Sequence, residues 1–322
     1  MKTEQVEAVI LGHAVGDALG VPVEFASREK LRAHPVREMR GYGTYDVPAG
    51  AWSDDTSMTL GTLASIARLG RVDARDIMQN FARWLNESAF TPTGETFDIG
   101  RTTLQAIGKF FHGEEPLLCG GRSEYDNGNG SLMRMAPVAL FAFAWHGTAL
   151  TEEDLRTVHA VSSLTHGHPL AQLACGIYTF ILVRLLAGEE RIAAVEKGLA
   201  AARSFYQERE VYAPRLRRFA RLFAVTAFRA LPEESIKSSG FVVDTLEAAL
   251  WCFLTTDSYR SCVERAVNLG EDTDTVAAVA GSLAGAAYGR ENIPSSWLDA
   301  LLRRDLLEHL SQAFAQMTEK EA

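Results

Sequence analysis

The chain has 322 residues, which suits one large domain or two ordinary ones, and its hydrophobic (47%) and charged (23%) fractions are normal for a globular protein. The formal net charge of −9 argues against proteins that bind nucleic acid or anionic membranes, because both classes need a basic surface. The four cysteines have no C-x-x-C spacing, which argues against a zinc ribbon or a secreted disulfide scaffold.

Two features bear on the compartment. Residues 1–7 are polar and include two glutamates, so we expect no signal peptide. The longest apolar run, residues 276–288, is too short to cross a bilayer. We therefore expect a cytoplasmic protein that binds no membrane.

Helical periodicity dominates the chain. Apolar residues recur at helical spacing in residues 140–145, 155–164, 170–186, 192–206 and 246–254. Only residues 21–25 and 242–243 resemble strands, and the longest expected loop covers residues 113–130. We predict one all-α domain over residues 1–322, with short connections between the helices.

Glycine recurs at every fourth residue in two segments, Gly12, Gly16 and Gly20 near the start and Gly281, Gly285 and Gly289 near the end. A glycine inside a helix costs about 1 kcal/mol relative to alanine, so close backbone packing must compensate. We predict that the two glycine stripes face each other or share one neighbouring helix. If the helices are antiparallel, Glu24 would lie beside Asp272 and Asp274. The alternative is that each stripe packs against large side chains of different helices.

Two acidic clusters precede helical segments, at residues 53–56 and 270–275. Taken alone, each would cap its helix and complement the helix dipole. If the two helix starts converge, the repulsion among their carboxylates requires cations. Ligands that are all hard oxygens select Mg²⁺, Mn²⁺ or Ca²⁺, and two such ions could hold a diol or activate a water.

A glycine-rich segment, residues 126–134, leads toward a helix expected over residues 136–145. Gly128 and Gly130 permit positive φ angles and close backbone approach, and free N–H groups near a helix start can bind phosphate. Arg134 could add a charge-assisted hydrogen bond. The alternative is an ordinary turn.

Two further segments have a functional and a structural interpretation. His166 and His168 could in principle bind a metal, but no cysteine or glutamate stands near them at zinc spacing. His166 could instead hydrogen-bond a ligand in a pocket, or be a neutral capping or packing histidine before the helix over residues 170–186. The four arginines of residues 215–221 form either a solvated helix face or a patch that binds a partner.

Five motifs, in their order along the chain, resemble those of the ADP-ribosylglycohydrolase family, whose members remove ADP-ribose from modified proteins and include the dinitrogen-reductase-activating glycohydrolases. They are residues 16–20 with Pro22 and Glu24, residues 53–56, residues 128–134, His166 with residues 168–169, and residues 272–275. The resemblance covers nearly the whole chain. It implies a single compact all-α domain of orthogonal helices, with a binuclear Mg²⁺ or Mn²⁺ site in a central cleft.

The resemblance also implies roles for individual residues. The implied metal ligands are Ser53, Asp54, Asp55, Asp272, Asp274 and Thr275. The implied ADP-ribose contacts are Gly128, Asn129, Gly130, Ser131, Met133, Arg134 and His166. Glu24 matches a glutamate beside the metals, and Asp98 matches an aspartate of the nitrogenase-type branch that faces the scissile bond.

The sequence departs from the family pattern at two positions. Ser53 stands where the family usually has threonine, which keeps the hydroxyl group. Glu271 stands where it usually has glycine, which would add a carboxylate near the metals.

The function that the resemblance implies is metal-dependent hydrolysis of the N-glycosidic bond between ADP-ribose and a protein arginine, with Glu24 or Asp98 as general acid/base. One alternative is hydrolysis of O-linked ADP-ribose, on serine or as a free ADP-ribose ester. Another is a protein that binds and occludes an ADP-ribosyltransferase. The expected partners are an ADP-ribosylated protein and, in the last case, a cognate transferase, but neither nucleic acid nor membrane.

Overall fold

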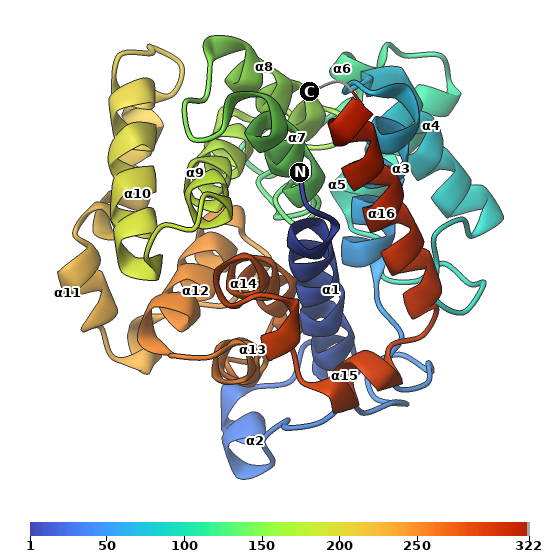
Figure 1. Cartoon of the computed structure of the whole chain (residues 1–322), viewed down its shortest axis with the longest axis vertical. Coiled ribbons are helices and arrows are strands. Elements are labelled where there is room, and N and C mark those ends of the chain that lie inside the picture. Colours follow the sequence, from blue (N-terminus) through green and yellow to red (C-terminus); the bar gives the residue numbers. More distant parts are fainter. Residues whose placement is uncertain (321–322) are drawn as a thin grey trace.

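The computed structural model describes residues 1–320, and this part of the chain folds into one helical domain with no β-sheet (Figure 1). The predicted all-α class is therefore confirmed. The helices are α1 (Thr3–Gly20), η1 (Val21–Val23), α2 (Arg28–Ala33), α3 (Asp54–Leu69), α4 (Ala74–Glu87), α5 (Arg101–Phe111), α6 (Pro116–Cys119), α7 (Ala136–His146), α8 (Glu152–Ser163), α9 (Pro169–Leu186), α10 (Arg191–Gln207), η2 (Ala213–Phe223), α11 (Val225–Arg229), η3 (Glu233–Ser235), α12 (Val242–Thr255), α13 (Tyr259–Asn268), α14 (Thr273–Tyr288), η4 (Arg290–Asn292), α15 (Ser295–Ala300) and α16 (Arg304–Lys320).

The first and fourteenth helices form the centre of the molecule. Figure 1 shows α1 in the middle, with α14 on one side and α16 on the other. Residues 6–20 of α1 and residues 273–285 of α14 are all buried. The segments Thr3–Val23 and Pro169–Leu186 are long and apolar enough to span a membrane, but each is 89% buried inside the protein, as core helices are.

The two glycine stripes bring α1 and α14 into direct backbone contact. A Cβ atom on Gly12 would lie 2.5 Å from the carbonyl oxygen of Gly281, and one on Gly16 would overlap the carbonyl group of Ala277. A Cβ on Gly20 would overlap the backbone of Asp274. The partner number falls as the α1 number rises, so the helices are antiparallel and the predicted pairing is confirmed.

Gly289 is the exception to the predicted stripe. It follows the last residue of α14 with φ +85°, and a Cβ there would meet the side chain of Glu291 rather than α1. It therefore ends the helix in a conformation that favours glycine.

Three expectations about local structure are wrong in detail. Residues 21–23 form the 3₁₀ helix η1 because Pro22 fixes its own φ and has no N–H group for a strand ladder. Val242 begins α12 rather than a strand. The expected loop over residues 113–130 contains the short helix α6, which begins at Pro116.

The arginine-rich segment forms the 3₁₀ helix η2, and its arginines have different environments. Arg218 lies over the ring of Phe241, with its Cζ atom 5.5 Å from the ring centroid. Arg221 pairs with the buried carboxylate of Glu247 at 2.9 Å. Part of this segment is therefore anchored to α12 rather than solvated.

The helix contact gives a direct test in two glycine variants. Gly16→Ala places a methyl group against the backbone of α14 and should lower the free energy of unfolding by at least about 2 kcal/mol. Gly108→Ala in α5 is the matched control, because nothing lies within 4 Å of its Cβ, and it should raise the free energy of unfolding by up to about 1 kcal/mol. Urea denaturation measures both, and equal stability of the two variants would contradict the packing.

Candidate functional site

A cluster of carboxylates lies where α1 ends and α3 and α14 begin. Oxygen atoms of Glu24, Asp98 and Asp274 all lie within 4.8 Å of one another. The Oδ2 atom of Asp55 accepts hydrogen bonds from the hydroxyl groups of Ser53 (3.1 Å) and Thr275 (3.2 Å). The two acidic helix starts therefore converge, although 217 residues separate Asp55 from Asp272 in the sequence.

The antiparallel helix pair explains how Glu24 reaches this cluster. Because Gly20 touches the backbone of Asp274, the chain leaves α1 directly beside the first turn of α14. Glu24 follows within a few residues, after η1. The predicted position of Glu24 beside Asp272 and Asp274 is confirmed, since Glu24 and Asp272 line the same cavity and an oxygen of Asp274 lies within 4.8 Å of one of Glu24.

Asp17 aligns α3 with α1, a role that the sequence analysis missed. Its carboxylate accepts the N–H groups of Ser53 (3.0 Å) and Thr56 (3.0 Å) and the hydroxyl group of Thr56 (2.6 Å). The available signal was a carboxylate in the mainly apolar stretch of residues 8–20. By binding the orphan donors at the start of α3, Asp17 fixes where Asp54 and Asp55 lie.

Tyr45 is a second residue that the sequence did not indicate. Its hydroxyl group donates to Oδ1 of Asp98 at 2.7 Å, and its ring lies 5.0 Å from that of Phe97. Asp98 has φ +53°, so its backbone adopts the left-handed conformation. These contacts hold the carboxylate of Asp98 over the cluster.

Asn129 links the glycine-rich loop to the cluster. Its Nδ2 atom donates to Oδ2 of Asp272 (2.8 Å) and to Oγ1 of Thr245 (2.9 Å). Its backbone N–H donates to the carbonyl group of Gly240 at 3.1 Å. These hydrogen bonds fix the position of the loop relative to the start of α14.

Burial and mutual repulsion raise the pKa values of these carboxyl groups. Burial first, and then the charges of Asp98 and Asp272, raise the pKa of Glu24 to about 9. Burial, followed by neighbouring carboxylates, also raises the pKa values of Asp54, Asp55 and Asp274 well above the usual range. Without cations, Glu24 holds its proton at neutral pH, and burial and repulsion favour the protonated form of the three aspartates.

The donor atoms of the cluster fit a hard divalent cation. Four buried carboxylate oxygens of the cluster have no hydrogen-bond partner among residues 1–320, namely Glu24 Oε2, Asp55 Oδ1, Asp272 Oδ1 and Asp274 Oδ2. An unpartnered buried oxygen costs about 1–3 kcal/mol, so four of them in one place need a ligand. Carboxylate and hydroxyl oxygens suit Mg²⁺ and Mn²⁺ better than zinc or copper.

A cavity of about 340 Å³ opens onto the cluster. Its lining combines acidic residues with the glycine-rich loop and the start of α5, namely Glu24, Phe25, Asp54, Asp98, Ile99, Gly100, Arg101, Thr102, Thr103, Gly128, Asn129, Gly130, Met133, His166, Gly240, Asp272 and Thr275. Ser53, Asp55 and Asp274 are not among these residues, although they belong to the acidic cluster. The first turn of α5, which the sequence analysis missed, can offer free N–H groups to an anion.

The glycine-rich loop meets the cavity in a way that differs from the expectation. Neither Gly128 nor Gly130 has a positive φ angle. A Cβ on Gly130 would lie 2.7 Å from Cε1 of His166, and one on Gly128 would lie 3.3 Å from its Nε2. Glycine is needed here because the His166 ring packs against the loop, and not because of the backbone conformation.

Two predicted ADP-ribose contacts have side chains that the structure does not place in the cavity. Arg134 is fully buried, and its guanidinium donates to Gly130 O (3.1 Å) and Thr165 Oγ1 (2.7 Å). Ser131 is also buried and accepts from Ser162 at 2.9 Å. The side chain of Arg134 points into the protein core and holds the glycine-rich loop through its bond to Gly130. It therefore offers no charge to a ligand in the cavity.

The structure gives the two histidines different roles, one in the cavity and one as a helix cap. His166 lines the cavity, and burial, followed by the charge of Arg134, lowers its pKa to about 3, so its ring is neutral. Its Nδ1 atom lies 2.8 Å from Thr165 Oγ1. His168 instead caps α9, because its Nδ1 atom accepts the N–H of Leu170 at 3.1 Å.

Glu271 does not add a carboxylate to the cavity, contrary to the expectation. Its side chain is exposed and does not line the cavity, and its backbone has φ +62°. Glycine adopts this conformation without strain, which explains why glycine is the natural residue at such a position.

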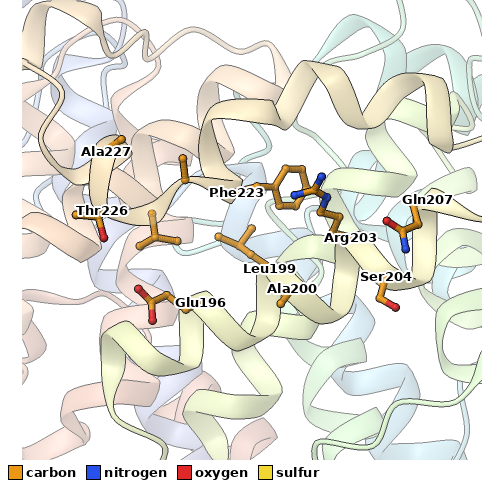
Figure 2. Close-up of a pocket in the computed structure, with 11 residues that line it drawn as sticks. Glu196, Leu199, Ala200, Arg203, Ser204, Gln207, Phe223, Thr226 and Ala227 are labelled. Carbon is orange, nitrogen blue, oxygen red and sulfur yellow. The ribbon is translucent and has the colours of Figure 1, made fainter.

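A larger hollow of about 670 Å³ lies between α10 and the segment from η2 to α11 (Figure 2). Its polar groups include Glu196, Arg203 and Gln207, and no residue of the acidic cluster lines it. Its charges do not converge on one point. The acidic cavity therefore remains the candidate site despite its smaller volume.

The raised pKa values predict how pH affects the metal-free protein. Glu24 keeps a proton in the folded state up to about pH 9 but loses it near pH 4.5 when unfolded. The folded state binds more protons between these values, so stability falls as pH rises. With chelator present, the free energy of unfolding should fall by more than about 1 kcal/mol from pH 7 to pH 8.5.

Glu24→Gln is the control for this pH effect, because glutamine does not titrate. The variant should show a flatter dependence in denaturant titrations at the two pH values. Parallel curves for the wild type and the variant would contradict the assignment of the raised pKa to Glu24.

Comparison with known proteins identifies the family. A family model described as ADP-ribosylglycohydrolase matches residues 2–322. The chain is 31% identical to "ADP-ribosylarginine hydrolase Tri1" of Serratia proteamaculans (99% of this chain, 81% of the relative) and 35% identical to "ADP-ribosyl-[dinitrogen reductase] glycohydrolase" of Rhodospirillum rubrum (90% and 88%). A solved structure described as "ADP-ribosylglycohydrolase-related protein complex" superposes with a TM-score of 0.79 at 34% identity, covering 98% of both chains. The chain belongs to the ADP-ribosylglycohydrolase family.

Proposed function

We propose that the protein is a metal-dependent hydrolase that cleaves the N-glycosidic bond between ADP-ribose and an arginine of a modified protein. The observation that carries the proposal is the convergence of the acidic helix starts, with four unpartnered oxygens, at a cavity that the glycine-rich loop also lines. The names of two relatives at 31% and 35% identity, which refer to ADP-ribosylarginine and ADP-ribosylated dinitrogen reductase, support this substrate class.

The residues that would hold two Mg²⁺ or Mn²⁺ ions are Ser53, Asp54, Asp55, Asp272, Asp274 and Thr275. When bound, the ions supply positive charge that holds ribose hydroxyl groups and lowers the pKa of a bound water. Asp17 and Asn129 would not bind the ions but would position their ligands. Asp17 fixes the start of α3, and Asn129 orients Asp272 through a hydrogen bond.

The remaining carboxylates move the protons of the reaction. Hydrolysis breaks the bond between ribose C1 and the guanidine nitrogen and forms a bond from C1 to a water oxygen. The departing nitrogen gains a proton and the water loses one. Glu24 and Asp98, whose oxygens lie within 4.8 Å of each other, form the acid–base pair, and Tyr45 positions Asp98. The deprotonated member of the pair also stabilises an oxocarbenium-like transition state through its negative charge.

The other end of the cavity would bind the rest of ADP-ribose. The glycine-rich loop with Met133, the neutral ring of His166 and the first turn of α5 all line it. Backbone N–H groups at the start of α5 suit the diphosphate, since no side chain is needed to supply the charge. Arg134 contributes by holding the loop rather than by contacting the ligand.

The linkage is tested with two defined substrates, an ADP-ribosylarginine peptide and an ADP-ribosylserine peptide, each with Mg²⁺, with Mn²⁺ or with chelator. We expect release of ADP-ribose from the arginine peptide with metal and none with chelator. Faster release from the serine peptide would favour the O-linked alternative. Failure on both substrates, with protection of cells from a transferase, would favour occlusion.

Two ligand variants test the metal site itself. Asp54→Asn and Asp274→Asn should each lower turnover by about a hundredfold or more, because even residues that only orient metal ligands cost 10- to 100-fold. Asp299→Asn is the control, since its side chain is 75% exposed and Asp299 is not among the residues that line the cavity. Unchanged turnover of both site variants at saturating metal would contradict the proposal.

A further inference from the structure

An exposed aromatic side chain, Phe25, stands at the rim of the cavity, directly after Glu24. It lines the cavity, yet 69% of its surface is exposed to solvent. Its backbone has φ +63°, a conformation that is an outlier for a bulky residue. Neither side-chain packing nor backbone preference accounts for an aromatic residue here.

Three of the seven non-glycine residues with positive φ among residues 1–320 lie at or beside this site. Among residues 1–320, the non-glycine residues with positive φ are Phe25, Tyr42, Ser88, Phe90, Asp98, Glu271 and Arg303. Phe25 and Asp98 line the cavity, and Glu271 bonds to the segment that carries Phe25. Such strain persists only where the surroundings enforce it, and it gathers at functional sites.

Backbone hydrogen bonds hold Phe25 in place without packing its ring. The N–H of Phe25 donates to the carbonyl of Glu271 (2.7 Å), and the N–H of Glu271 donates to the carbonyl of Ala26 (2.8 Å). These two bonds tie the segment after Glu24 to the start of α14. The ring is thus presented at the mouth by a fixed backbone and is free to meet a ligand.

The surroundings of the ring suit a planar cation. The carboxylates of Glu24 and Asp98 line the cavity with Phe25, and the face of an aromatic ring attracts a guanidinium group. If the ribose lies at the acidic cluster, the group attached to it leaves toward the rim. A serine side chain at the same place would offer no charge to the ring.

We infer that Phe25 is a specificity-determining residue that stacks on the guanidinium of the ADP-ribosylated arginine and so favours arginine over neutral linkages. The inference rests on the proposed function, since it concerns the leaving group of that reaction. It assigns Phe25 no contact with the ADP-ribose moiety.

The test compares Phe25→Leu with Phe25→Tyr. Leucine keeps an apolar side chain without the aromatic face, so kcat/KM on an ADP-ribosylarginine peptide should fall about three- to thirtyfold. Tyrosine keeps the face and should retain the wild-type value. Inhibition by free ADP-ribose, which lacks the leaving group, should keep its wild-type inhibition constant in both variants, and thermal unfolding confirms that both fold.

Tyr42→Leu is the matched control. Tyr42 is also aromatic, 71% exposed and in a left-handed conformation (φ +56°), but it does not line the cavity. Its replacement should leave kcat/KM unchanged.

The inference would be overturned by an unchanged kcat/KM for Phe25→Leu, by an equal loss for Tyr42→Leu, or by a weaker inhibition by ADP-ribose in Phe25→Leu. Because Phe25→Tyr keeps the fold and the aromatic face, a loss in that variant equal to that of Phe25→Leu would also overturn it. If the wild type fails to cleave the arginine peptide, the proposed function itself fails, which is a different result.

Discussion

The direct backbone contact between α1 and α14 is the constraint on which the rest of the structure depends. Glycine at positions 12, 16, 20, 281 and 285 removes the side chains that would hold the helices apart. The antiparallel direction then places the end of α1 against the first turn of α14. Glycines inside helices lower the stability of those helices, but here they allow the close packing that brings Glu24 to the start of α14.

This geometry brings several buried carboxylates close together, so they repel one another. Asp17 accepts the free donors at the start of α3 and thereby holds Asp54 and Asp55 close to the carboxylates of α14. Repulsion and burial then raise the pKa values of the group. Under the proposed function, this repulsion would favour the binding of divalent cations, so the contact that organises the fold would also contribute to the metal affinity of the site.

The sequence predicted those features that follow from local spacing. The glycine stripes and the helix-capping role of residues 53–56 were accessible, since each depends on a regular helix. The meeting of the two acidic clusters was expected only from the family resemblance, because their spacing along the chain left it conditional. The inward turn of Arg134, the bond from Tyr45 to Asp98 and the packing of His166 on Gly130 were not accessible. These depend on loops whose path is set by tertiary contacts, and no periodic pattern marks them.

The most direct test of the account is a crystal structure with Mn²⁺, using anomalous scattering to locate the ions. The account predicts anomalous peaks among the carboxylates of Asp54, Asp55, Asp272 and Asp274, in contact with the oxygens of the last three that have no hydrogen-bond partner among residues 1–320. Peaks elsewhere, or no peak at saturating Mn²⁺ with the four carboxylates still converged, would contradict the claim that the α1–α14 contact builds a cation site.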